Sequence, residues 1–269
     1  MNAHFQTIVS DLDGTLLKNH LEVTENTRLI LHAAQQKGIE LVIATGRPFQ
    51  LIKKYMDELP FVNYFILNNG AAVYSRIKND YLFQSFIEQA DIASLIHFAE
   101  VNATDFELHT HNALVVSGEK RQAFFKAYVN RLPESFKPHI VQYRAPEDHL
   151  DVTKMMLIQD DIKRYHSLKA ELQNIPHLSI VQSQDTYIDV NVQNISKGAA
   201  LKRLADTVGW DKNQIIALGD QENDHSMLDY AGTAVAMGNA VQSVKEIADM
   251  ITDSSDNDGV YQALKKLGI

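Results

Sequence analysis

Short apolar runs alternate with segments of helical periodicity in the first third of the chain. Residues 5–10 form an apolar run typical of a buried strand, and residues 24–37 repeat apolar side chains at helical spacing behind the candidate N-cap Thr24. The apolar stripe of this helix is expected at Leu29, Ile30, Ala33 and Ala34. Runs at residues 39–44 and 64–74 predict two further strands, the second interrupted in its middle by Asn-Asn-Gly. This alternation predicts a parallel sheet with crossover helices.

The pattern changes in the middle of the chain and then returns. After about Tyr81, apolar and polar positions alternate as in strands with one exposed face, and helices are expected near residues 121–132 and 162–172. From Ser196 onward the buried strands and amphipathic helices of the first style resume. We therefore predict an α/β core interrupted by an inserted α+β domain. The expected boundaries are residues 1–82 and 188–269 for the core and residues 83–187 for the insertion.

Composition and charge disfavour several classes of protein. The 269 residues contain no cysteine, which excludes disulfides, thiolate zinc sites and thiol catalysis. The net charge of −9 disfavours a nucleic-acid scaffold and adhesion to an anionic membrane, so we expect neither partner. No apolar stretch approaches the length that spans a bilayer, and the first residues lack the pattern of a signal peptide. We therefore expect a cytoplasmic protein.

Polar residues follow each of the apolar strands. In a parallel sheet these positions lie at the carboxyl ends of the strands, where such sheets bind ligands. Taken strand by strand, the residues are Asp11 and Asp13; Thr45, Gly46 and Arg47; Asn68, Asn69 and Gly70; and Asp220, Asn223 and Asp224, with Lys197 at the start of the helix before the last strand. Each segment alone is explained by a turn, a helix start or a solvated side chain. Their coincidence at every strand end predicts one shared site.

The residue types in this site indicate phosphoryl chemistry. Three of the carboxylates form a hard oxygen site of the kind that Mg²⁺ prefers: Asp11, Asp13 and Asp220. A dication also explains how these like charges tolerate one another. A phosphate would be held by an ammonium, a hydroxyl and an amide, those of Lys197, Thr45 and Asn223. A carboxylate that attacks phosphorus gives an aspartyl-phosphate, and an adjacent carboxyl group can move the proton.

Four segments in order resemble the signature motifs of the haloacid dehalogenase superfamily. They are DLDGT at residues 11–15, TGR at residues 45–47, SKG at residues 196–198 and GDQENDHSML at residues 219–228. The insertion lies between the second and third motifs, like the family's type II cap, and its strand and helix content is similar to that of the Cof-like, type IIB sugar-phosphatase branch. The segments NNGA and DGV also resemble that branch. The resemblance implies a Rossmann-like core with an α+β cap of type C2B.

The resemblance assigns roles to the residues of these motifs. It implies that Asp11 is the nucleophile and that Asp13 is the general acid and then the base. The metal ligands implied are Asp11, Asp13 through its backbone carbonyl, Asp220, and Asp224 in the second shell or through water. The phosphate- and substrate-binding residues implied are Leu12, Thr45, Gly46, Lys197 and Asn223, with Arg47 and Asn69 as neighbours of the substrate. Many relatives carry a proline and a glycine where this chain has residues 192–195, so the closing of the cap is expected to differ here.

The function implied is a Mg²⁺-dependent phosphatase that hydrolyses a small phosphomonoester, such as a sugar phosphate, pyridoxal phosphate or nucleotide. The family's dehalogenases lack a second aspartate at the position of Asp13. A phosphomutase of the same superfamily is an alternative, although its usual cap lies between Asp13 and Thr45, where this chain is short. A non-catalytic phosphate-binding regulatory protein is another. We expect the cap histidines His109 and His111 to be exposed or substrate-facing. The oligomeric state stays open, and a monomer is compatible with the sequence.

Overall fold

The computed structural model describes residues 5–144, 150–184 and 186–269, and the chain divides into two compact units. The first, here the core unit, consists of Met1–Gly46, Tyr55–Phe83 and Ser196–Ile269, and the second, here the cap unit, consists of Arg47–Lys54 and Gln84–Ile195. The sequence predicted an insertion at residues 83–187. The cap unit of the structure runs on to Ile195 and also takes the short segment after Gly46, which the sequence did not indicate.

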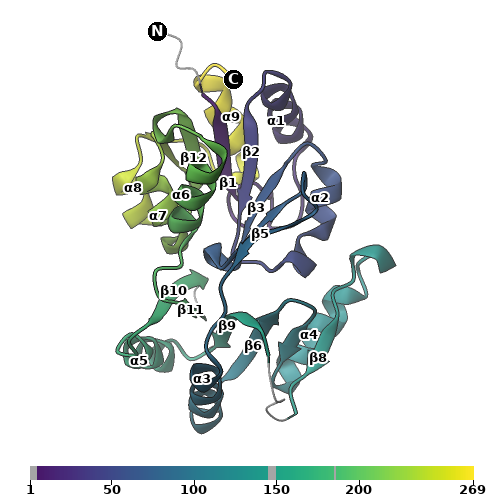
Figure 1. The fold of residues 1–269 in the computed structure, drawn as a ribbon, viewed down its shortest axis with the longest axis vertical. Helices are drawn as coiled ribbons and strands as arrows, with labels where there is room; N and C mark the ends of the chain where they lie inside the picture. The colour runs from purple at the N-terminus through teal and green to yellow at the C-terminus, as the bar shows by residue number, and fades with distance from the viewer. Residues whose placement is uncertain (1–4, 145–149, 185) are drawn as a thin grey trace. The chain divides into compact units, whose positions relative to one another are not determined.

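The core unit is built on an eight-stranded sheet (Figure 1). Its order is β14-β13-β12-β1-β2-β3-β4-β5, and the pairs from β14 to β3 are parallel. The strands are β1 (Thr7–Asp11), β2 (Glu40–Ala44), β3 (Tyr64–Leu67), β4 (Ala72–Ser75), β5 (Asp80–Gln84), β12 (Ile215–Gly219), β13 (Thr233–Ala236) and β14 (Met250–Ile251). All residues of β1 and β12 are buried, as strands of a parallel sheet covered on both faces should be. The predicted parallel sheet is therefore confirmed.

Helices cover both faces of this sheet (Figure 1). α1 packs against α9, and α7 packs against both α6 and α8. Their bounds are α1 (Glu25–Gln36), α2 (Lys53–Glu58), α6 (Lys197–Val208), α7 (His225–Tyr230), α8 (Gln242–Ile247) and α9 (Gly259–Lys266). Thr24 caps α1 as predicted, because its hydroxyl accepts a hydrogen bond of 3.2 Å from the backbone N–H of Thr27. The expected apolar stripe was partly wrong: Leu31 is buried in place of Leu29, which is half exposed.

The apolar segment at residues 64–74 forms two strands. β3 and β4 are antiparallel neighbours, joined by the short 3₁₀ turn η2 (Asn68–Gly70). Asn68 and Asn69 both have positive φ, at 50° and 58°, in the left-handed region that asparagine tolerates better than most residues. The interruption that the sequence placed inside one strand is therefore a hairpin turn at the end of the parallel part of the sheet.

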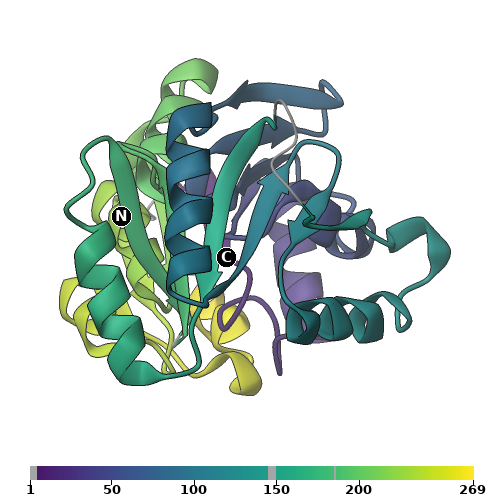
Figure 2. The same ribbon diagram turned by 90° about the horizontal axis from the view of Figure 1, so that it is seen from below.

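The cap unit has a six-stranded sheet of order β10-β11-β9-β6-β7-β8, antiparallel except for the pair β7 and β8. Its elements are α3 (Gln89–Val101), β6 (Asp105–Thr110), β7 (Leu114–Val116), α4 (Glu119–Val129), β8 (Ile140–Gln142), β9 (Val152–Ile158), α5 (Ile162–Leu172), β10 (Leu178–Gln184) and β11 (Tyr187–Val192). α3 and α5 pack on one face of this sheet over one hydrophobic cluster (Figure 2). α5 has the predicted bounds, whereas the sequence did not indicate α3.

No helix in the described part of the chain has the length and apolar character needed to cross a membrane.

Candidate active site

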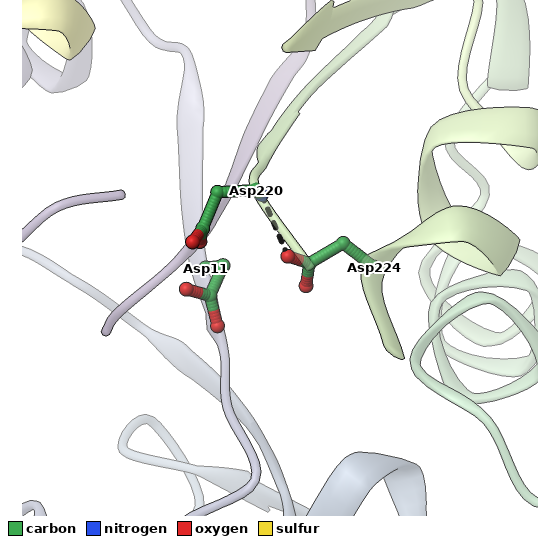
Figure 3. Close-up of side chains that lie close together, drawn as sticks. All are labelled: Asp11, Asp220 and Asp224. Carbon is green, nitrogen blue, oxygen red and sulfur yellow. Dashed lines mark hydrogen bonds between the residues drawn. The ribbon is translucent and has the colours of Figure 1, made fainter. Parts of the chain in front are cut away.

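Three aspartates meet at the carboxyl ends of two neighbouring strands of the core unit (Figure 3). Asp11 is the last residue of β1, Asp220 follows β12, and these two strands pair in parallel register. Asp224 ends the 3₁₀ turn η5 (Glu222–Asp224). One carboxylate oxygen of each residue lies within 4.8 Å of the others, and all three side chains are buried. The structure thus brings together Asp11 and Asp220, which the sequence placed in one oxygen site, but the third carboxylate of the cluster is Asp224 in place of Asp13.

Lys197 neutralises part of this charge. It is the first residue of α6, and the preceding Ser196 caps this helix, because its hydroxyl accepts a hydrogen bond of 3.1 Å from the backbone N–H of Ala199. The Lys197 Nζ is fully buried and donates hydrogen bonds of 2.6 Å to Asp11 Oδ1 and Asp224 Oδ1. Burial alone would lower the pKa of Lys197, but the two carboxylates outweigh it and raise that pKa. The ammonium is therefore held charged and at a fixed place.

Asp11 and Asp220, the two residues of this cluster with the chemistry to face a metal, both have raised pKa values. Burial raises the pKa of Asp220 to about 7, and the Asp224 carboxylate adds to this effect. Burial also holds the pKa of Asp11 well above its usual range, despite the opposing effect of Lys197. One ammonium does not balance three carboxylates removed from water. The cluster is therefore arranged for a further positive charge.

This donor set fits a hard divalent cation. Asp11 and Asp220 present oxygen ligands, the type that Mg²⁺ and Ca²⁺ take. Asp224 is held differently, because its Oδ1 accepts from Lys197 and its Oδ2 accepts from the backbone N–H groups of Asp220 (2.8 Å) and Gln221 (3.0 Å). Both oxygens of Asp224 are therefore used within the protein, and its contacts orient Lys197 and the loop that carries Asp220.

Gly14 makes room for the cluster. Its φ of 82° lies in the left-handed region, and a Cβ at this position would stand 2.5 Å from Asp220 Oδ2. The chain can therefore turn away directly behind Asp11 and Asp13 while the Asp220 carboxylate packs against the turn.

The other predicted residues of the core unit lie at strand ends and in loops. Asp13 is half-buried, and its charge contributes to raising the pKa of Asp11 and Asp220. Thr45 is buried and Gly46 half-buried at the end of β2. The Asn223 Nδ2 donates a hydrogen bond of 3.0 Å to Asn69 Oδ1.

The side chains of two predicted binding residues are not shown at this cluster. The side chain of Leu12 is fully buried, so only its backbone could meet a substrate. Arg47 belongs to the cap unit, where its Nη1 donates to the Leu51 carbonyl at 3.5 Å. The role expected for Arg47 as a neighbour of the substrate stays a prediction.

A model of the haloacid dehalogenase-like hydrolase family matches residues 8–264, which includes every residue of this cluster. The chain belongs to this family. It is 30% identical to the putative phosphatase YxeH of Bacillus subtilis, over 98% of both chains. It is also 30% identical to the 5-amino-6-(5-phospho-D-ribitylamino)uracil phosphatase YcsE of the same organism, over 96% of this chain and 94% of the relative. A subclass IIB sugar phosphatase of the superfamily has the same fold, with a TM-score of 0.84 and 24% identity over 98% and 99% of the two chains.

Two polar contacts of this haloacid dehalogenase-like hydrolase were missed by the sequence reasoning. The Thr15 hydroxyl donates a hydrogen bond of 2.9 Å to Asp220 Oδ1. The Asn239 Nδ2 donates to the Gly14 carbonyl at 2.8 Å and lies 3.5 Å from Asp220 Oδ2. Thr15 was visible in the first motif, whereas Asn239 stands in a loop with no recognisable pattern. Both residues orient the Asp220 carboxylate and the turn at Gly14.

The cap unit of this hydrolase contains buried pairs of ionisable side chains. They lie on the sheet strands and on α4, and form the pairs Arg121 with Glu107, His109 with Glu107, and Lys154 with Asp189. The two nitrogen–oxygen distances are 3.3 Å for His109 Nε2 to Glu107 Oε2 and 3.1 Å for Lys154 Nζ to Asp189 Oδ2. His109 is buried and therefore not exposed, and whether it faces a substrate stays a prediction. His111 is exposed as expected.

Proposed function

We propose that this chain is a Mg²⁺-dependent phosphatase that hydrolyses small phosphomonoesters through an aspartyl-phosphate on Asp11. That it is a phosphatase follows from its family and from the names of its relatives. The metal, the substrate class, the intermediate and the roles of the residues are the proposal. The observation that carries it is the pair of hydrogen bonds from buried Lys197 to Asp11 and Asp224, beside Asp220.

Asp11 acts as the nucleophile in this proposal. A carboxylate oxygen of Asp11 forms a bond to phosphorus while the bond from phosphorus to the ester oxygen breaks, and Asp13 gives its proton to the leaving alkoxide. Lys197 stays within reach of Asp11 and stabilises the charge on the phosphoryl oxygens. Asp13, now a carboxylate, takes a proton from water, whose oxygen attacks the phosphorus and releases inorganic phosphate and free Asp11.

A divalent metal completes the charge balance of this site. Enzymes of this family generally use a metal, and the buried carboxylates of Asp11 and Asp220 have the chemistry to hold one. We assign Mg²⁺ to Asp11, Asp220 and the backbone carbonyl of Asp13, with Asp224 supporting Lys197 and the loop of Asp220. When bound, the ion supplies positive charge to the nucleophile and the phosphoryl group.

The substrate is a small molecule that carries a phosphomonoester. The relative YcsE is named for a ribityl phosphate, and the structural neighbour is named a sugar phosphatase. These names support a phosphorylated metabolite of sugar or nucleotide type for this chain. The leaving alcohol would be chosen by residues outside the cluster, because in the mechanism above the cluster acts on the phosphoryl group and Asp13 meets only the ester oxygen of the alcohol.

The Asp11→Asn variant tests the nucleophile. Its amide cannot attack phosphorus, so hydrolysis of p-nitrophenyl phosphate with Mg²⁺ should fall by about 10³-fold or more. The control is Asp249→Asn, the same substitution at a carboxylate that accepts a hydrogen bond of 2.8 Å from the Ala234 N–H in the same unit. It should retain wild-type activity. Wild-type protein should also form an acid-stable phosphoryl adduct on Asp11. Substantial turnover by Asp11→Asn would overturn the proposed nucleophile.

A further inference from the structure

The turn η2 contains two consecutive buried asparagines in left-handed conformation. Asn68 and Asn69 have φ of 50° and 58°, and both side chains are buried at the end of β3. Such backbone conformations are costly for residues other than glycine, and they persist where surrounding contacts fix them. The contacts of this turn therefore indicate what the conformation serves.

η2 contacts three separate segments of the candidate active site. The backbone N–H of Asn69 donates a hydrogen bond of 3.1 Å to the carbonyl of Thr45. The Asn69 Oδ1 accepts the 3.0 Å hydrogen bond from Asn223 Nδ2. Gly70 lies directly against the residue that precedes Lys197, since a Cβ on Gly70 would stand 2.2 Å from the Ser196 carbonyl oxygen. One three-residue turn thus joins the loops that carry the second, third and fourth motifs.

We propose that Asn69 is a positioning residue that acts through Asn223, an inference that rests on the proposed function. An asparagine side chain can present either its oxygen or its nitrogen to a ligand. By accepting one N–H of Asn223, Asn69 fixes the nitrogen side of that amide and leaves its second N–H to donate to a phosphoryl oxygen. The left-handed backbone of Asn69 places its side-chain Oδ1 for the hydrogen bond from Asn223. At the same time, the backbone N–H of Asn69 donates to the carbonyl of Thr45. In this proposal Asn69 acts on the phosphoryl group through Asn223.

Asn69→Ala tests this role by removing the oxygen that accepts from Asn223. With p-nitrophenyl phosphate and Mg²⁺, kcat/KM should fall about 10-fold, the scale expected when a donor is present but misplaced. Asn223→Ala should cost at least as much. In the Asn223→Ala background, Asn69→Ala should have no further effect on kcat/KM, because its partner is already gone. A purely structural role would instead lower the activity of both backgrounds equally.

Asn79→Ala is the matched control. Asn79 also has a left-handed backbone, with φ of 51°, and its Oδ1 also accepts a hydrogen bond, 2.7 Å from the Tyr74 hydroxyl, in the turn between β4 and β5. Asn79→Ala also places alanine in a left-handed backbone and also removes one accepted hydrogen bond, as Asn69→Ala does. It should nevertheless leave kcat/KM unchanged. Asn69→Gly adopts positive φ without strain but lacks the oxygen, so it should lose activity as Asn69→Ala does.

The outcomes separate this inference from the proposed function. An inactive wild-type protein would contradict the proposed function, whatever the variants show. An active wild type together with full activity of Asn69→Gly would overturn the positioning role. Independent, multiplying losses for Asn69→Ala and Asn223→Ala would also overturn it. If Asn69→Ala fails to fold, Asn69→Gly alone and combined with Asn223→Ala gives the same comparison.

Discussion

At the scale of single residues, the candidate site is governed by an excess of buried negative charge. Lys197 makes hydrogen bonds to two carboxylates, yet Asp11 and Asp220 still keep raised pKa values. Removal from water is the largest cause of the raised pKa in both cases, and the carboxylates of Asp224 and Asp13 add to it. Binding of a dication should lower both pKa values, because it favours the charged form of Asp11 and Asp220. Proton binding and metal binding should therefore compete at this site.

In the metal-free protein, the contribution of Asp220 to the free energy of unfolding should decrease as the pH rises. The pKa of this acid goes from 3.8 as an ordinary carboxyl group to about 7 in the folded protein. Between these values the folded state holds the proton that the unfolded state has released, so stability falls with rising pH and levels off above about 7. In EDTA, the Tm of Asp220→Asn should match that of the wild type near pH 4 and exceed it increasingly toward pH 7.5. Addition of Mg²⁺ at pH 7.5 should raise the Tm of the wild type more than that of the variant. A constant difference in Tm across this pH range would contradict the shift.

The sequence predicted the residues of the cluster but not their partners. Asp11, Lys197 and Asp220 were identifiable because each follows a strand or begins a helix, in an order that resembles the family's motifs. The bond between Asn69 and Asn223 joins residues 154 positions apart, and no local pattern connects them. Asn239 donates to the carbonyl of Gly14 across 225 positions of the chain. Such contacts depend on how strands and loops meet in three dimensions, which periodicity does not report.

At the scale of elements, predictions succeeded where a helix has both a start signal and a clear stripe. α5 begins after Asp161, whose Oδ1 accepts from the backbone N–H groups of Lys163 and Arg164, and its predicted bounds match the structure. α3 has the buried spacing of Ile92, Leu95, Ile96 and Ala99, but the Glu88 side chain makes no capping hydrogen bond. The apolar side chain of Val101 is exposed, so the apolar positions of α3 do not all lie on its buried face. The sequence therefore did not indicate this helix. The predicted third strand became a hairpin for a related reason, since Asn-Asn-Gly marks an interruption but not the direction of the chain after it.

Lys154 and Asp189 should be a structurally critical pair of the cap sheet. They lie on the neighbouring strands β9 and β11, and their side chains are only 3% and 0% exposed. Asp189→Ala would leave a buried ammonium without this carboxylate and should lower the free energy of unfolding by about 3–5 kcal/mol. The combined change Lys154→Met and Asp189→Leu should recover most of that loss, because it removes both charges. Urea unfolding monitored by circular dichroism measures these differences.

The exposed pair Lys202 and Asp206 on α6 provides the control for the buried pair. Its nitrogen–oxygen distance is 2.7 Å, but the two side chains are 60% and 62% exposed. Asp206→Ala should change the free energy of unfolding far less than Asp189→Ala does, since water screens the exposed pair. Equal losses for Asp189→Ala and Asp206→Ala would show that burial does not set the importance of the first pair.

At the scale of the whole molecule, the chain passes between the two units at four places. These are the peptide bonds after Gly46, Lys54, Phe83 and Ile195. Despite this interleaving, the main hydrophobic cluster of the cap consists of residues between Ile87 and Val190. The short segment after Gly46 adds Gln50, whose Nε2 donates to the carbonyls of Thr110 (3.1 Å) and His111 (2.8 Å). The cap therefore has a continuous stretch with its own core and one added segment that supports the hairpin of β6 and β7.

Residues 84–195 should consequently fold when expressed alone. The cluster supplies an apolar core from α3, α5 and the sheet, so unfolding in urea should be a single cooperative transition. Gln50→Ala in the full chain removes the same two hydrogen bonds that the fragment lacks and should cost about 1–3 kcal/mol in the cap's free energy of unfolding. A fragment with helical far-ultraviolet dichroism, a broad transition and binding of a hydrophobic dye would instead show that the inserted residues need the rest of the chain to pack, because those properties mark a compact state without fixed side-chain packing.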